Sequence, residues 1–310
     1  MDMSEVIKMA ESLSENSVKN LRRLTDVFAG DMAGKVAVVS GGATGLGFNI
    51  VNRLAEAGCK VVIASRSEER GAKAVDEFTA MGYEVSFCKT DVTVVSDCYA
   101  AVDFAVQKYG KIDILVANSA TWSMYSFVDM PEDKFDAAIA VDLKGEYFMA
   151  QAAARAMIKA KTPGKIVFIS SAAHRASDTP RMGLMTHYNA AKGALVSMTK
   201  GIAKELHQYG IGVNCVAPGV MLTRGSIFNG GESGTLYGPE YLADRSTFGR
   251  TVPVAKNPDM VALAVFAMCT SMSDFMVGET VTVDGGSTLS FQEKPWSYTL
   301  EGCIPGPKAE

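Results

Sequence analysis

Short apolar runs alternate with segments of helical periodicity from about residue 35 to about residue 285 of the chain. Such runs are typical of strands that are buried on both faces of a parallel sheet. The expected strands are 35–40, 60–66, 83–89, 112–118, 165–171, 212–217 and 279–283. One expected helix follows a glycine loop at 41–47. The others span 96–109, 132–160 and 188–209. The alternation predicts an α/β fold, a doubly wound parallel sheet of about seven strands with helices on both faces.

No linker-like stretch interrupts this alternation, so residues 34–290 are expected to form one domain. Residues 1–33 carry two amphipathic stripes and predict an N-terminal helical extension, whose apolar face would pack on the domain or on a neighbouring subunit. A loosely docked tail is the alternative. Residues 224–250 are rich in glycine and aromatic side chains and are expected to form a flap over a pocket. Residues 291–310 are expected to form an irregular C-terminal tail.

The composition excludes several classes of protein. The 310 residues are 48% hydrophobic and 21% charged, which predicts a large buried core and no long disordered region. A net charge of −4 gives no reason to expect nucleic acid or an anionic membrane as a partner. We expect no signal peptide and no membrane-spanning helix. The six cysteines are scattered and the three histidines lack metal-ligand spacing, so we expect reduced thiols, no metal site and a cytoplasmic protein.

A glycine-rich loop follows the first expected strand and leads directly into a helix. Its sequence is GGATGLG, at residues 41–47. Glycines permit a tight turn and a close approach of the backbone, while the N-terminus of the helix attracts an anion. The strand, loop and helix together predict a cradle for the pyrophosphate of a dinucleotide.

The end of the second expected strand bears on the choice of dinucleotide. An acidic residue about 20 positions after the glycines would hold the ribose hydroxyls of NAD. Ser65 and Arg66 occupy these positions instead. An arginine here suits a 2′-phosphate, so the sequence favours NADP(H) without excluding NAD(H).

Tyr188 and Lys192 stand four positions apart in a helical segment, so their side chains lie on one face. An ammonium group near a phenol favours the phenolate and draws the pKa of the tyrosine down from its ordinary value near ~10. A tyrosine tuned in this way can exchange a proton at working pH. The spacing also occurs by chance on solvated helix faces, so the pair gains meaning only from the site around it.

The motifs in this order make residues 34–290 resemble the short-chain dehydrogenase/reductase family. The loop 40–47 resembles the glycine motif of the family, with Ser40 in place of its threonine. Residues 117–120 stand where the family has N-N-A-G, and Val283-Asp284-Gly285-Gly286 resembles the end of its last strand. Other matching positions are Asp91, Val92, Ser171, Tyr188, Lys192, Pro218, Gly219 and Thr223.

The resemblance implies a Rossmann-type fold and an NAD(P)(H) cofactor, with no metal. Ser171 would hydrogen-bond the substrate oxygen and Tyr188 would pass it a proton. Lys192 would lower the pKa of the tyrosine and hold the nicotinamide ribose. The positions implied to contact the cofactor are Gly41, Thr44, Gly45, Leu46, Gly47, Ser65, Arg66, Asp91, Val92, Asn118, Tyr188, Lys192, Pro218, Gly219 and Thr223.

The chain departs from the family pattern in two places. Asp142 stands where the family has a catalytic asparagine that holds a water in a proton path to the lysine. Our hypothesis is that the Asp142 carboxylate keeps this relay and steadies Lys192; a tolerated near-isostere is the alternative. The interval from Ser171 to Tyr188 is also longer than is usual, with the added residues falling within 174–182. These residues are expected to shape specificity, with a plain surface loop as the alternative.

The resemblance implies a carbonyl reductase or secondary alcohol dehydrogenase that acts on a small ketone or alcohol. The N-terminal extension looks like that of some bacterial 20β-hydroxysteroid dehydrogenases, so steroid metabolism is the favoured expectation. A sugar ketone, a 3-oxoacyl thioester or a dienoyl-CoA fits the same core, and a cofactor-binding regulator without turnover is a remote alternative. The family also implies a homo-oligomer, either a dimer or a homotetramer. His187 neighbours Tyr188 but faces another way on the helix, so a packing or surface role is expected.

Overall fold

The computed structural model describes residues 30–175, 184–221, 223, 258–286 and 288. Most of the predicted N-terminal extension, the predicted flap at 224–250 and the predicted tail at 291–310 lie outside the described residues. Residues 176–183, which fall in the lengthened interval before Tyr188, lie outside them as well. The division of the chain into an extension, a domain and a tail therefore stays a prediction.

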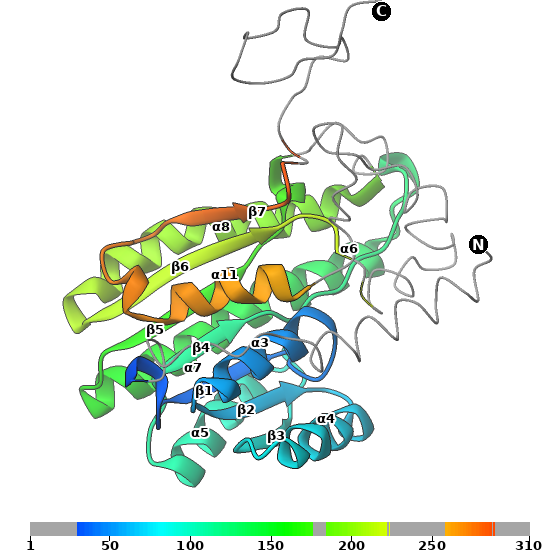
Figure 1. Ribbon diagram of the computed structural model, residues 1–310. Helices are drawn as coiled ribbons and strands as arrows, with labels where there is room; N and C mark the ends of the chain where they lie inside the picture. The colour runs from blue at the N-terminus through cyan, green and yellow to red at the C-terminus, as the bar shows by residue number, and fades with distance from the viewer. Residues whose placement is uncertain (1–29, 176–183, 222, 224–257, 287, 289–310) are drawn as a thin grey trace, which may run out of the picture.

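The described residues form a seven-stranded, wholly parallel sheet, as the alternation predicts (Figure 1). The strands are β1 Val36–Ser40, β2 Lys60–Ser65, β3 Val85–Lys89, β4 Ile114–Ala117, β5 Gly164–Ile169, β6 Ile211–Pro218 and β7 Thr280–Val283. Their order across the sheet is β3-β2-β1-β4-β5-β6-β7. The core residues of β1, β4 and β5 are almost fully buried, which explains their continuous apolar sequences.

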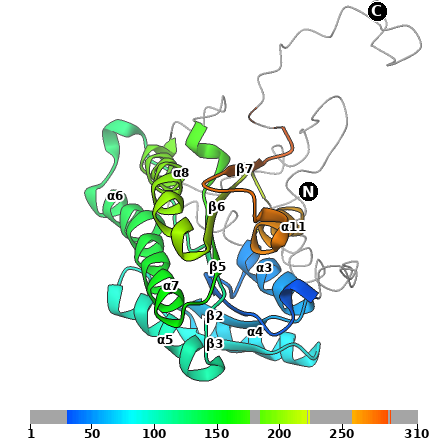
Figure 2. The ribbon, with the colours of Figure 1, turned by 90° about the vertical axis from the view of Figure 1, so that its left-hand side faces the viewer.

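Helices cover both faces of the sheet (Figure 2). One face carries α3 Gly45–Glu56, α4 Glu68–Ala80 and α11 Asp259–Cys269, and the other carries α5 Val95–Tyr109, α7 Glu146–Ala160 and α8 Thr186–Leu206. Each face buries its own apolar cluster against the strands. Helices α4 and α11 are not among those expected from the sequence. The doubly wound, Rossmann-type architecture is confirmed.

The strand order reverses at the centre of the sheet, between β1 and β4. From β1 the chain first builds outward through β2 to β3, and it then returns to place β4 on the other side of β1. Ligands of such sheets bind in the crevice at the carboxyl ends of the strands, where the order reverses. At this point hydrogen bonds join Ser40 to Asn118, so the glycine loop after β1 lies beside the segment that follows β4.

The single helix expected at 132–160 contains a π-helical turn. It consists of α6 Glu132–Ile139, the π-helix η2 Ala140–Gly145 and α7 Glu146–Ala160. The turn lies close to the segment after β3, because a Cβ atom added at Gly145 would lie only 2.8 Å from Cβ of Val92. Two acidic side chains of this region, Asp142 and Glu146, are each 0% exposed. Single π turns inside α-helices are rare and frequently mark functional sites.

A buried ion pair joins α3 to α11. Nε and Nη2 of Arg53 lie 2.7 and 2.6 Å from the two carboxylate oxygens of Asp259. The side chains are 3% and 4% exposed. Planar, bidentate pairing of this kind is the strong form of the arginine–carboxylate interaction. It fixes α11 on the sheet beside α3.

Replacing Arg53 with methionine should therefore destabilise the protein by about 3–5 kcal/mol, because it removes the guanidinium from a buried carboxylate. The free energy of unfolding in urea measures this loss. Lys89→Met is the matched control, since its 2.8 Å contact with Glu68 joins side chains that are 66% and 68% exposed. The control should cost less than about 1 kcal/mol. Equal losses in the two variants would contradict the special weight given to the buried pair.

Candidate active site

The glycine loop leaves the end of β1 and turns sharply into α3. Gly41 and Gly45 have positive φ angles of 62° and 58°, which residues other than glycine rarely adopt. A Cβ atom added at Gly47 would lie 2.2 Å from the carbonyl oxygen of Gly41, so only glycine fits there. Helix α3 begins at Gly45 after Thr44, and the N–H groups of its first turn, around Leu46, are available to an anion. The backbone at these positions fits a pyrophosphate.

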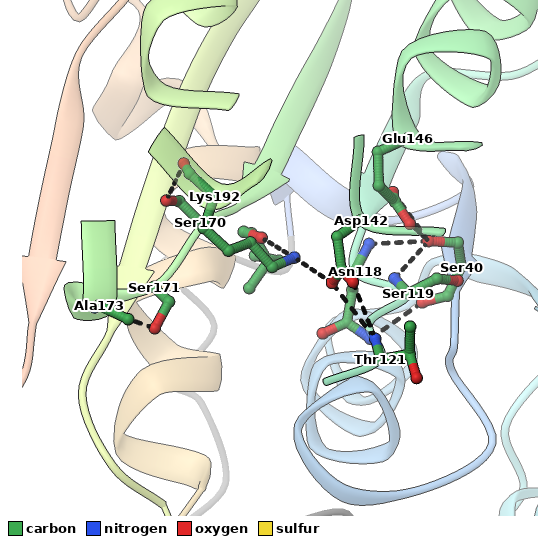
Figure 3. A network of polar contacts seen from close by, with 11 residues as sticks. Ser40, Asn118, Ser119, Thr121, Asp142, Glu146, Ser170, Ser171, Ala173 and Lys192 are labelled. Atoms are coloured by element: carbon green, nitrogen blue, oxygen red, sulfur yellow. Dashed lines mark hydrogen bonds and ion pairs between the residues drawn. The ribbon is translucent and has the colours of Figure 1, made fainter. Parts of the chain in front are cut away.

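Ser40 ties this loop to the next strand of the sheet (Figure 3). Its hydroxyl oxygen accepts hydrogen bonds from the backbone N–H groups of Asn118 and Ser119, at 2.7 and 2.9 Å. The amide nitrogen of the Asn118 side chain donates to the Ser40 carbonyl at 3.0 Å. The predicted cofactor position Asn118 thus holds the loop in place.

The ends of β2 and β3 lie farther along the same edge of the sheet. Ser65 Oγ is buried, and among the described residues it has no hydrogen-bond partner, which suits a position that meets a polar ligand. Arg66 beside it is exposed. Burial opposes the ionisation of Asp91, but hydrogen bonds from Thr93 and the charge of Arg66 hold the pKa of this carboxyl below its usual value. Val92 is buried.

The segment after β6 crosses toward the glycine loop. Pro218 is the last residue of β6 to pair with β7, and the N–H of Gly219 donates to the carbonyl of Val283 at 2.9 Å. Thr223 lies over the loop, because a Cβ atom added at Gly45 would lie 3.4 Å from its Cβ. The structure thus brings the predicted cofactor positions that follow β1, β2, β3, β4 and β6 to the carboxyl ends of the strands.

The predicted catalytic side chains gather beside this edge. Tyr188 and Lys192 lie one turn apart on α8, and both are buried. The Lys192 ammonium lies 5.7 Å from the centroid of the Tyr188 ring and donates to the carbonyl of Ile169 in β5 at 3.0 Å. Ser171 lies just beyond β5, where its side chain lowers the pKa of Tyr188 slightly and its Oγ accepts the N–H of Ala173 at 3.2 Å. Sequence positions far apart therefore meet at one phenol.

Asp142 lies directly behind the lysine. Its Oδ1 is 3.2 Å from Nζ of Lys192, and its carboxylate accepts the backbone N–H of Thr121 (Figure 3). Burial raises the pKa of Asp142 to about 6 although Lys192 draws it down. Burial works against the ammonium of Lys192, but Asp142 and, more weakly, Tyr188 raise its pKa above the ordinary value. The two groups form a buried ion pair near neutral pH.

One expectation from the sequence is wrong: the pKa of Tyr188 is raised, not lowered toward neutrality. Burial of the phenol is the largest cause. The positive charge of Lys192 acts in the expected direction, but the negative charge of Asp142 opposes it. The spacing of Tyr188 and Lys192 shows neither the burial of the phenol nor the carboxylate behind the lysine. The carboxylate behind the lysine changes the balance.

Three residues near the site escaped the sequence analysis. Glu146 lies one helical turn beyond Asp142, and its carboxyl accepts the Ser40 hydroxyl. An acidic residue four positions after another, at the start of an apolar run, was the available signal. Trp122 packs edge-on against Tyr188 with ring centroids 5.9 Å apart. Oγ of Ser123 lies 3.2 Å from Nε2 of His187.

His187 itself is 1% exposed, and burial lowers its pKa. Its position agrees with the expected packing role. In the part of the chain that the structure describes, no group of three or more His, Cys, Asp or Glu side chains could hold a metal ion. Within the same ranges, no helix has the length and apolar character needed to cross a bilayer.

The sequence profile described as "short chain dehydrogenase" matches residues 35–228 of the chain. The 3-oxoacyl-[acyl-carrier-protein] reductase FabG of Chlamydia pneumoniae is 32% identical over 263 residues, which cover 83% of this chain and 98% of that protein. Galactitol 2-dehydrogenase of Agrobacterium fabrum is 32% identical over 259 residues, covering 83% and 98%.

A solved structure gives the same result. The short chain dehydrogenase from Burkholderia cenocepacia in complex with NADP has a TM-score of 0.72 and 30% identity, and it covers 83% of this chain and 99% of that chain. The family binds NAD(P) and acts on alcohol and ketone groups of small molecules. The fold, the glycine loop and these similarities together place the chain in the short-chain dehydrogenase/reductase family of NAD(P)-dependent oxidoreductases.

Proposed function

We propose that the chain is an NAD(P)H-dependent carbonyl reductase, working in reverse as a secondary alcohol dehydrogenase, with Tyr188 as the group that exchanges a proton with the substrate oxygen. The observation that carries the proposal is the meeting of Ser171, Tyr188 and Lys192 beside the glycine loop. A carbonyl oxygen placed between the two hydroxyl groups would accept hydrogen bonds from both. Reduction then requires one proton, which the phenol of Tyr188 supplies.

Lys192 and Asp142 act on Tyr188 through charge. The ammonium stabilises the phenolate that remains after Tyr188 donates its proton, and the 3.2 Å contact with Asp142 holds the ammonium in place. The carbonyl of Ile169 fixes it from the other side. Asp142 also reduces the net positive charge near the phenol. We infer that it is a positioning residue that steadies Lys192 and sets the pH range of proton transfer.

The loop 41–47 would hold the cofactor pyrophosphate, while Pro218, Gly219 and Thr223 would lie at its nicotinamide end and Ser65, Asp91 and Val92 at its adenosine end. When bound, the nicotinamide supplies the hydride in reduction and accepts it in oxidation. Arg66 supports a preference for NADP(H), because its exposed guanidinium at the end of β2 can pair with a 2′-phosphate.

The side chains around Tyr188 favour a ketone with an apolar flank. Its ring packs with Ala173 and Met185, and the partly buried side chains of Trp122, Met124 and Val220 pack against this cluster. A 3-oxoacyl substrate combines a ketone with an apolar chain, and the similarity to an acyl-carrier-protein reductase supports this class. The similarity to galactitol 2-dehydrogenase supports a sugar alcohol as the second candidate. None of the relatives described above has a steroid in its name, so the steroid substrate stays a prediction.

The predicted assembly and location also belong to this proposal. Phe135 on α6 and Tyr147 on α7 are 44% and 42% exposed, which supports contact between copies of the chain through these helices. We infer a homo-oligomer, either a dimer or a tetramer. The cytoplasmic location stays a prediction.

Replacing Tyr188 with phenylalanine should lower kcat for ketone reduction about 10²- to 10⁴-fold, because the proton donor is lost while the ring is kept. The measurement uses a panel of 3-oxoacyl thioesters, sugar ketones and steroid ketones with NADPH. Binding of NADPH to the variant is the control and should remain within about twofold of the wild type, which is less than 0.5 kcal/mol. Undiminished ketone reduction by the variant would contradict the proposed mechanism. Wild-type binding of NADPH without turnover of any ketone would favour the non-catalytic regulator instead.

Replacing Asp142 with asparagine should move the pH profile of alcohol oxidation to lower pH by about one unit. The carboxylate opposes the effect of Lys192 on the phenol, so a neutral amide lets the ammonium lower the pKa of Tyr188 further. Oxidation needs the phenolate, which then forms at lower pH. The profile of kcat from pH 6 to 10 checks this sign. An unchanged rate and profile would show that Asp142 is only a tolerated replacement.

Replacing Arg66 with alanine should raise KM for NADPH about tenfold, the equivalent of roughly 1.4 kcal/mol for a charge-assisted contact, and leave KM for NADH nearly unchanged. Initial rates with each nucleotide measure the two constants. Arg70→Ala is the control, because this arginine is also exposed and lies on α4, four positions farther along the chain. A wild-type preference for NADH would overturn the weight placed on Arg66.

A further inference from the structure

A second carboxyl group is buried beside the site and has no role in the mechanism described so far. Glu146 is the first residue of α7, directly after the π turn, and is 0% exposed. Glutamate is almost never fully buried unless it has a partner that offsets the cost. An apolar side chain would be the ordinary choice in this helix, whose neighbours Met149 and Ala150 are core residues. The burial of an acid here therefore calls for a cause.

The contacts of Glu146 connect it to the start of the glycine loop. Both of its carboxyl oxygens lie 3.2 Å from Oγ of Ser40 (Figure 3). The Ser40 oxygen already accepts two backbone N–H groups, from Asn118 and Ser119, so its single proton is free to point to Glu146. Glu146 thus fixes the hydroxyl that joins the end of β1 to the segment after β4. The glycine loop starts at the next residue.

The charges that act on Glu146 come from the predicted catalytic centre. Lys192 on α8 favours its ionised form, and Asp142 on η2 opposes it. On α5, the thiol of Cys98 is near enough for the Glu146 charge to act on its pKa. Two carboxyls therefore share the neighbourhood of one ammonium, which can neutralise only one of them. Asp142, in direct contact with Lys192, is that one.

We propose that Glu146 is a positioning residue of the reaction, which holds Ser40 and the cofactor loop with its carboxyl and sets the charge around Lys192 by gaining or losing its proton. The inference rests on the proposed reductase function. Burial raises the pKa of Glu146 to about 8, so the group is neutral at pH 7 and ionises in the mildly alkaline range. Its negative charge then opposes the phenolate of Tyr188 by offsetting Lys192.

Two variants separate the hydrogen bond from the charge. Glu146→Gln keeps an oxygen that accepts the Ser40 hydroxyl and removes the titrating group. It should bind NADPH within about twofold of the wild type and shift the pH profile of alcohol oxidation to lower pH by about half a unit. Glu146→Leu removes both features and should also weaken NADPH binding about fivefold, as expected for one lost hydrogen bond. A purely structural role predicts no shift of the profile in Glu146→Gln.

Asp113→Asn is the matched control. Asp113 is also a buried carboxyl held by β1, since it accepts the backbone N–H of Val36 at 2.7 Å, but it lies at the opposite end of that strand from Ser40. Its variant should lose stability without a change in the pH profile or in NADPH binding. If Glu146→Gln does not fold, Ser40→Ala tests the loop contact, and unchanged NADPH binding in that variant would overturn it.

The thermal midpoint gives a readout that needs no activity. Glu146 keeps its proton in the folded state up to about pH 8, whereas the unfolded chain loses it around the ordinary value of 4.5. The folded state thus binds more protons in this window, and its stability falls as pH rises. The midpoint of the wild type should therefore fall relative to Glu146→Gln between pH 5 and 8 and then level off. If the midpoints of the wild type and Glu146→Gln change with pH in parallel, the proposal for Glu146 is overturned, even if the protein is a reductase. If the wild-type midpoint falls as expected but the protein reduces no ketone, only the proposed reductase function is overturned.

Discussion

A single ammonium group, buried between α8 and the π turn η2, is the point on which the site depends. Lys192 is 1% exposed and is held by Asp142 and by the carbonyl of Ile169. A buried charge without a close partner would lose its proton or unfold its surroundings. The carboxylate and carbonyl therefore determine where α8 can lie relative to β5. Because Tyr188 is one turn away on α8, the position of the phenol follows from that of the lysine.

The electrostatics of this centre differ from those that a tyrosine and a lysine alone would give. Burial is the largest cause of the raised pKa of Tyr188, and the negative charge of Asp142 opposes the lowering effect of Lys192. Glu146 adds a group that is neutral at pH 7 and charged above about pH 8. Tyr188, Lys192 and Asp142 therefore titrate as a coupled group, and Glu146 is coupled in turn to Lys192 and Asp142. Glu146 extends this coupled group to the glycine loop through its contact with Ser40.

The strands and the glycine loop could be predicted because their signals are local. A buried parallel strand is apolar throughout, and the loop 41–47 needs glycine where a Cβ would collide with backbone, as at Gly47. The π turn could not be predicted, because it leaves no periodic signal, and the close approach of Gly145 to Val92 joins segments far apart in the sequence. The roles of Ser40 and Glu146 escaped for the same reason, since they depend on a contact between residues 106 positions apart. The raised pKa of Tyr188 follows from burial, which spacing does not reveal.

The parallel sheet has a consequence for the order in which the molecule forms. Strand β1 pairs with β4, which follows β2 and β3 in the sequence, and Arg53 meets Asp259 across 206 positions of sequence. Closing such long loops costs entropy before any contact repays it, so folding is expected to be slow compared with that of helical bundles of similar size. During synthesis α3 leaves the ribosome long before α11, and the apolar surface of α3 and β1 is exposed in the meantime. The ion pair that locks the finished sheet is among the last contacts the growing chain can make.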